Sequence, residues 1–141
     1  HLLPSWPKNE YLDSPINIFC ITIGIIISIR GFIISLRSFL DLGKNLSPLP
    51  YPMKRSKLTR EKSYKTTRHP LYKGLLFISL GISIILLSLI HLFLFILLAI
   101  TLKIKALREE AELKLRYSEY EEYIKEVPAI IENIKYLDWR S

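Results

Sequence analysis

The longest uncharged stretch of the sequence runs from Leu75 to Leu102 and contains no Asp, Glu, Lys or Arg. A second apolar stretch, residues 16–40, contains only Arg30 and Arg37 as charged residues. In a bilayer the backbone must satisfy its own hydrogen bonds, so apolar segments of this length form helices even when they are rich in isoleucine. The two stretches therefore predict an all-α membrane protein.

Residues 70–107 are too long for one membrane span. As a single helix these 38 residues would extend over ~57 Å at ~1.5 Å per residue, against a hydrocarbon core of ~30 Å. A turn near Ser88–His91 divides them into a helical hairpin. We predict about three transmembrane helices, at 16–40, 70–88 and 91–108, followed by a cytosolic C-terminal helix, all in one domain over residues 1–141.

Positive charge is concentrated at one side of the predicted spans. The loop 41–69 carries eight Lys or Arg residues against two acids, and the whole chain has a net charge of +7. The hairpin returns Lys103 and Lys105 to the side of this loop, and the positive-inside rule then places the loop and the C-terminus in the cytoplasm. The long uncharged stretches argue against a nucleic-acid-binding protein.

Metal binding and disulfide formation are not expected from this sequence. The three histidines lie far apart in the sequence, which gives no spacing typical of a zinc site. Cys20 is the one cysteine of the sequence, so it cannot form an internal disulfide. We therefore expect no metal site.

The motif RHPLYKG, residues 68–74, directly precedes the longest uncharged stretch. Pro70 suits the first position of a helix, which places Arg68 and His69 at the helix N-terminus, and Tyr72 within its first turn. Backbone N–H groups and the helix dipole favour an anion there, and the guanidinium fork of Arg68 suits a carboxylate. Alternatively, Arg68 and His69 only flank a membrane helix on its basic side.

A second candidate site is LREEAELKLRY, residues 107–117. Glu110 and Glu112 each have a basic residue four positions later, which predicts a solvent-exposed face. We expect Glu109 to point toward the packed side, where a carboxylate can accept hydrogen bonds, face a cation or act as a base, or serve a purely structural role. Glu109 shares its side of the helix with Leu102, Ala106, Leu113 and Tyr117.

Three tyrosines follow at a spacing of three residues. Such a series usually packs at a membrane interface, but its rings can also wall a binding pocket or face a cation. The three are Tyr117, Tyr120 and Tyr123.

In this order, these motifs resemble the isoprenylcysteine carboxyl methyltransferase and phospholipid methyltransferase family of integral membrane enzymes. The resemblance covers residues 40–130. It is carried by NLSPLP at 45–50, Leu58, Tyr64, RHPLYKG, REEAEL at 108–113, the three tyrosines and Val127-Pro128.

The resemblance implies an S-adenosylmethionine-dependent methyltransferase. Its acceptor would be a lipid or lipidated substrate that enters from the membrane, either a carboxylate of the prenylcysteine type or a phospholipid amine. Arg68, Glu109 and Glu110 would lie at the methyl-transfer point. The implied cofactor-binding residues are His69, Tyr72, Leu113, Tyr117 and Tyr120.

Two other interpretations remain open. The NADPH-dependent sterol reductases have a similar RHP region, although they have many more spans than this chain can form. A small membrane scaffold could also keep the same fold without turnover.

Overall fold

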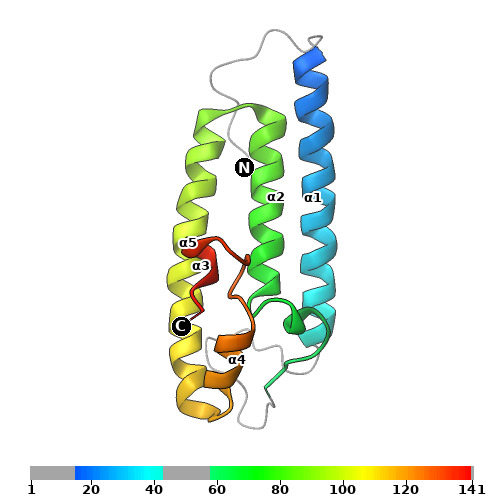
Figure 1. Ribbon diagram of the computed structural model, residues 1–141. Helices are drawn as coiled ribbons and strands as arrows, with labels where there is room; N and C mark the ends of the chain where they lie inside the picture. The colour runs from blue at the N-terminus through cyan, green and yellow to red at the C-terminus, as the bar shows by residue number, and fades with distance from the viewer. Residues whose placement is uncertain (1–14, 43–57, 141) are drawn as a thin grey trace.

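The computed structural model describes residues 15–42 and 58–140, and within them three long helices run side by side (Figure 1). Residues 1–14, the motif NLSPLP and most of the predicted basic loop, 43–57, lie outside the described residues. The long helices are α1 (Pro15–Leu42), α2 (Pro70–Leu86) and α3 (Leu89–Arg116); the short ones are η2 (Lys62–Lys65), α4 (Tyr120–Glu126) and α5 (Lys135–Asp138).

The all-helical fold with a hairpin is confirmed. Helices α1 and α3 have 28 residues each and are apolar and long enough to cross a membrane. Helix α2 is shorter, with 17 residues, or ~25 Å at ~1.5 Å per residue. The outer face of α1 is apolar, with Phe19 64% and Leu40 65% exposed. A bilayer would cover such a face, whereas water would make it unfavourable.

The turn between α2 and α3 lies where the sequence predicts it. Leu87 adopts a left-handed conformation, with φ 43°, and ends α2. The Ser88 hydroxyl then accepts a hydrogen bond from the His91 N–H at 3.5 Å, which caps the start of α3. The turn is therefore as short as predicted, but it lies two residues earlier than the predicted helix boundaries 88 and 91.

The third helix extends beyond residue 108, the predicted end of its membrane span. Helix α3 continues to Arg116, because residues 103–116 are rich in Lys, Glu, Leu and Ala, which all favour helix. The helix ends at Tyr117, which is extended with φ −126° and ψ 110°. The chain then turns back, so that α4 packs beside the end of α3 (Figure 1).

Helices α1 and α2 approach each other along a seam of small residues. Gly24 and Gly31 of α1 are spaced by seven residues, as are Gly74 and Gly81 of α2. A Cβ added at Gly31 would lie 2.7 Å from the Gly74 carbonyl oxygen. Only glycine allows backbones this close, and the seven-residue period keeps the seam on one face of each helix.

We predict that Gly31→Ala destabilises the protein by roughly 1–3 kcal/mol, because the new methyl group meets backbone atoms that cannot rotate away. The measurement is the thermal unfolding midpoint in detergent. The control is Ile29→Ala on the same helix, since Ile29 is 54% exposed and faces away from the seam. Equal midpoints for the two variants would contradict the close approach of the helices.

Candidate functional site

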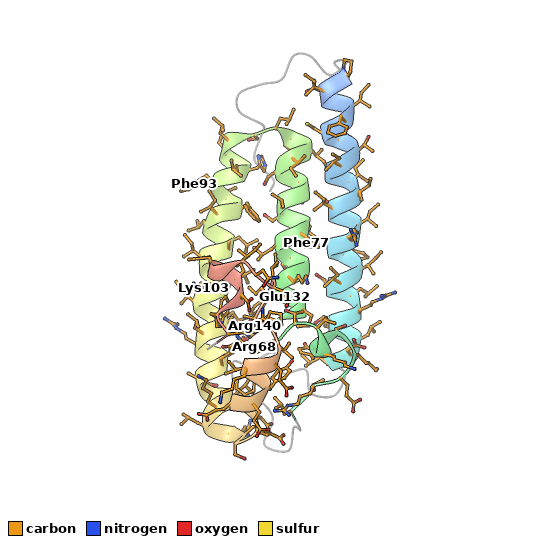
Figure 2. The ribbon with its side chains drawn as sticks, in the orientation of Figure 1. Arg68, Phe77, Phe93, Lys103, Glu132 and Arg140 are labelled. Carbon is orange, nitrogen blue, oxygen red and sulfur yellow. The ribbon has the colours of Figure 1, made fainter. Side chains whose placement is uncertain are left out.

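The RHP motif and the Val-Pro motif lie next to each other in the structure. The Arg68 N–H donates to the Pro128 carbonyl and the His69 N–H to the Ala129 carbonyl, both at 2.9 Å. The buried Thr67 hydroxyl also donates to the Ala129 carbonyl, at 2.7 Å. These bonds attach the C-terminal segment to the start of α2, at the same end of the bundle as α4 and well away from Phe77 and Phe93 (Figure 2).

The Glu110 carboxylate is the centre of a buried polar cluster. Glu110 is only 4% exposed. One oxygen, Oε1, accepts from His69 Nε2 at 2.9 Å and lies 3.0 Å from Arg68 Nε. The other oxygen, Oε2, accepts from the Trp139 indole N–H at 3.0 Å. An ionised carboxylate has acceptors only, so the His69 Nε2 carries the hydrogen in this contact.

Arg68 is enclosed by the protein. Its side chain is 0% exposed, and its two Nη atoms donate to the Ile124 and Trp139 carbonyls at 3.0 and 3.4 Å. The anion expected beside this guanidinium is therefore the chain's own Glu110. Arg68 does more than flank a membrane helix, because it joins α2 to α3, α4 and the C-terminal segment.

The predicted orientations of the two glutamates need correction. We expected Glu110 on a solvent-exposed face and Glu109 on the packed side; instead Glu110 is buried and the Glu109 side chain is 32% exposed. The local pairing of Glu110 with a basic residue four positions later is weaker than its contacts with Arg68 and His69. A buried carboxylate with several donors is favoured over a surface pair, which contributes little.

Glu109 forms the accessible part of the site. Its Oε1 accepts from the Tyr72 hydroxyl at 2.7 Å and lies 3.8 Å from Lys105 Nζ, while its Oε2 lies 3.9 Å from His69 Nδ1. The rings of His69 and Tyr72 are parallel within 3°, with centroids 5.2 Å apart. A partly exposed carboxylate beside stacked rings is a surface suited to a cation.

The tyrosine series packs as a second core next to this cluster. Tyr120 and Tyr123 are 1% and 4% exposed, and Leu113 and Tyr117 pack against them. Burial raises the pKa of the Tyr120 and Tyr123 phenols well above their ordinary value. Both therefore stay neutral at physiological pH. The cofactor-binding roles assigned to Leu113, Tyr117 and Tyr120 stay predictions.

Sequence reasoning missed Trp139 as a member of the site. Its indole N–H donates to Glu110, and its ring centroid lies 6.5 Å from that of His69. Lys103 lies 5.4 Å from the centre of the Trp139 ring. The available signal was the indole N–H itself, which needs a hydrogen-bond partner when buried.

Comparison with known proteins gives one family match. The family model described as phospholipid methyltransferase matches residues 19–120. The matched residues contain α2, α3 and both glutamates of the site, and they end before Trp139. No curated protein matches the chain.

We predict that Glu110→Gln destabilises the protein by about 3–5 kcal/mol, because it leaves the buried Arg68 guanidinium without its counter-charge. The matched variant Glu109→Gln removes a carboxylate that is one-third exposed, and it should cost about 1 kcal/mol or less. Unfolding free energies measured in detergent test the contrast. A larger loss for Glu109→Gln would reverse the assignment of the buried and accessible glutamates.

Proposed function

The chain belongs to the phospholipid methyltransferase family, and from that premise we propose that it transfers a methyl group from S-adenosylmethionine to the amine of a membrane phospholipid. The observation that carries this proposal is the meeting of His69, Tyr72 and Glu109 at one end of the α2–α3 hairpin. Helices long and apolar enough to cross a membrane place such a site within reach of lipid.

The residues of the site fit the cationic part of the cofactor. S-adenosylmethionine, when bound, supplies a methyl group on a positively charged sulfur. Glu109 offers a carboxylate, and the stacked rings of His69 and Tyr72 offer π-electron density beside it. His69 and Tyr72 would hold the cofactor. Leu113 and Tyr117 would line its side, with the buried Tyr120 behind them.

The contacts of Arg68 favour an amine over a carboxylate as acceptor. A carboxylate substrate would need an accessible cation to orient it, but the Arg68 side chain is fully buried and already paired with Glu110. The exposed Lys105 is already paired with the Glu109 carboxylate, at 3.8 Å, and Glu109 is the accessible charge of opposite sign. It accepts a proton from the lipid ammonium, which frees the nitrogen lone pair for bond formation, and later returns that proton to water.

The protein and the bilayer together orient the two reacting groups. Tyr72 holds the carboxylate from α2, and the lipid headgroup approaches sideways from the bilayer, so the acceptor arrives already oriented. The end of the bundle that carries this site also carries Lys103, Lys105 and residues 58–69. By the positive-inside rule this end faces the cytoplasm.

We expect wild-type protein in detergent to transfer label from methyl-labelled S-adenosylmethionine to phosphatidylethanolamine, giving a product that is stable to mild base. Glu109→Gln should lower the rate ~100-fold or more, because the proton acceptor is lost, while the thermal midpoint changes little. The control is Glu112→Gln, the same substitution three residues further along α3, which should keep the wild-type rate.

Three results would contradict the proposal. Label released by base as a volatile compound would indicate a methyl ester and a carboxylate acceptor. An unchanged rate of label transfer in Glu109→Gln would show that Glu109 is not the base. A wild-type protein that neither binds S-adenosylmethionine nor incorporates label would favour the non-catalytic scaffold, and NADPH binding in its place would favour the reductase interpretation.

A further inference from the structure

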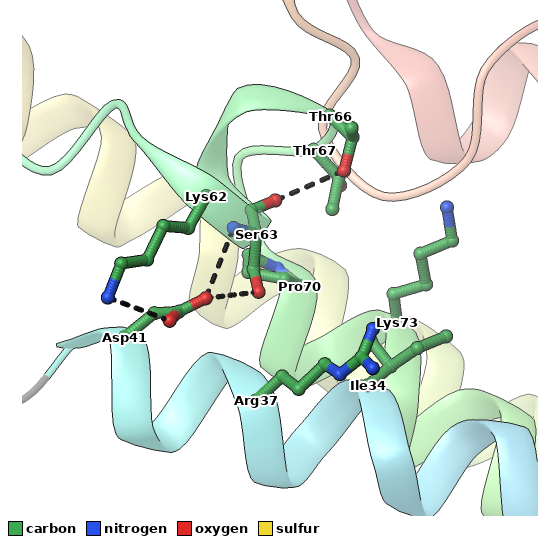
Figure 3. A pocket seen from close by; sticks show the side chains of 9 residues that line it. All are labelled: Ile34, Arg37, Asp41, Lys62, Ser63, Thr66, Thr67, Pro70 and Lys73. Atoms are coloured by element: carbon green, nitrogen blue, oxygen red, sulfur yellow. Dashed lines mark hydrogen bonds and ion pairs between the residues drawn. The ribbon is translucent and has the colours of Figure 1, made fainter.

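A cavity of about 420 Å³ lies between α1, η2 and α2, and neither Glu109 nor Glu110 lines it. Its lining residues come from the last turns of α1, from η2 and the two residues that follow it, and from the first turn of α2 (Figure 3). Its charged lining residues are Arg37 and Asp41 of α1, Lys62 of η2 and Lys73 of α2. With three cations and one carboxylate, the lining has a net positive charge.

The negative charge of Asp41 is already matched within the protein. Its carboxylate lies 3.4 Å from Lys62 Nζ and accepts from the Ser63 N–H and hydroxyl, at 3.2 and 2.5 Å. Arg37 extends from α1 toward α2, where Lys73 stands (Figure 3). Across residues 15–42 and 58–140, neither the Arg37 side chain nor the Lys73 side chain forms an ion pair or a hydrogen bond. The cavity therefore presents two uncompensated positive charges to a ligand.

The depth of these two cations in the membrane suits a lipid phosphate. Arg37 lies five residues before the end of α1 and Lys73 three residues after the start of α2, which is within ~8 Å of the helix ends. Long cationic side chains at this depth reach the headgroup region. Beside the cavity, Leu36 and Leu40 of α1 are 47% and 65% exposed. They offer an apolar path for acyl chains.

We propose that this cavity is a binding site for the phosphate of an anionic phospholipid, whose acyl chains lie along α1. Basic pockets between transmembrane helices recognise such headgroups. The site is separate from Glu109 and the stacked rings, so the proposal does not depend on methyl transfer. Its occupant would be a resident lipid that does not react.

The test is a titration of the intact protein in neutral detergent, with bound lipid counted by native mass spectrometry. Phosphatidylglycerol is compared with phosphatidylcholine of the same acyl chains. We expect one phosphatidylglycerol molecule to bind more tightly than phosphatidylcholine. The double variant Arg37→Gln/Lys73→Gln should weaken this binding roughly 25-fold, at about fivefold for each cation near an anionic headgroup.

Two further variants control for charge and folding. Lys114→Gln/Lys125→Gln removes two exposed positive charges outside the cavity and should keep the wild-type affinity. Arg37→Lys/Lys73→Arg preserves both charges and should also keep it. Three results would overturn the proposal. The first is equal affinity of the wild type and Arg37→Gln/Lys73→Gln, the second is an equal loss of affinity in Lys114→Gln/Lys125→Gln, and the third is equal binding of the two lipids. Displacement of the lipid by millimolar inorganic phosphate would assign the cavity to a soluble anion instead.

Discussion

The buried Glu110 carboxylate is the interaction on which this end of the bundle depends. Removing a charge from water costs several kcal/mol, and only close donors recover that cost. Here two other segments supply the partners: before α2, Arg68 forms an ion pair and His69 a hydrogen bond, and near the C-terminus Trp139 donates a second hydrogen bond. Both segments must pack against α3, because the absence of either would leave a buried polar group without a partner. The same assembly fixes the His69 ring, and with it the stacked pair that faces Glu109.

Hydropathy predicts the helices well and the tertiary contacts poorly. The three long helices and the turn at Ser88 follow from uncharged length and bilayer thickness, which are local properties of the chain. The burial of Glu110 does not follow from local properties, because its partner Arg68 belongs to another segment. Reasoning from neighbours on the same helix therefore assigned the exposed face to the wrong glutamate. The turn at Tyr117 depends on tertiary contacts in the same way. Residues 103–116 favour helix locally, and the packing of α4 against α3 decides where the chain turns.

Helix α2 presents different chemistry to its two neighbours. Toward α3 it offers His69 and Tyr72, which meet the glutamates. Toward α1 it offers Gly74 and Gly81, and the close backbone approach there sets the register of the two helices. That register is what brings Arg37 beside Lys73 at the cavity. The neighbour of Arg37 on α2 follows from the glycine seam and not from the sequence around Arg37.

The shortness of α2 has a consequence for the membrane around the protein. A helix of 17 residues spans ~25 Å, a few ångströms less than the usual hydrocarbon core of ~30 Å. Because α1 holds α2 closely along the glycine seam, α2 cannot shift independently to reduce this mismatch. The bilayer must adapt instead, and lipids next to α2 shorten or disorder their chains. The headgroups next to α2 move toward the centre of the bilayer, so the membrane is locally thinner there. A membrane with a thin hydrocarbon core therefore accommodates the fold at the lowest elastic cost.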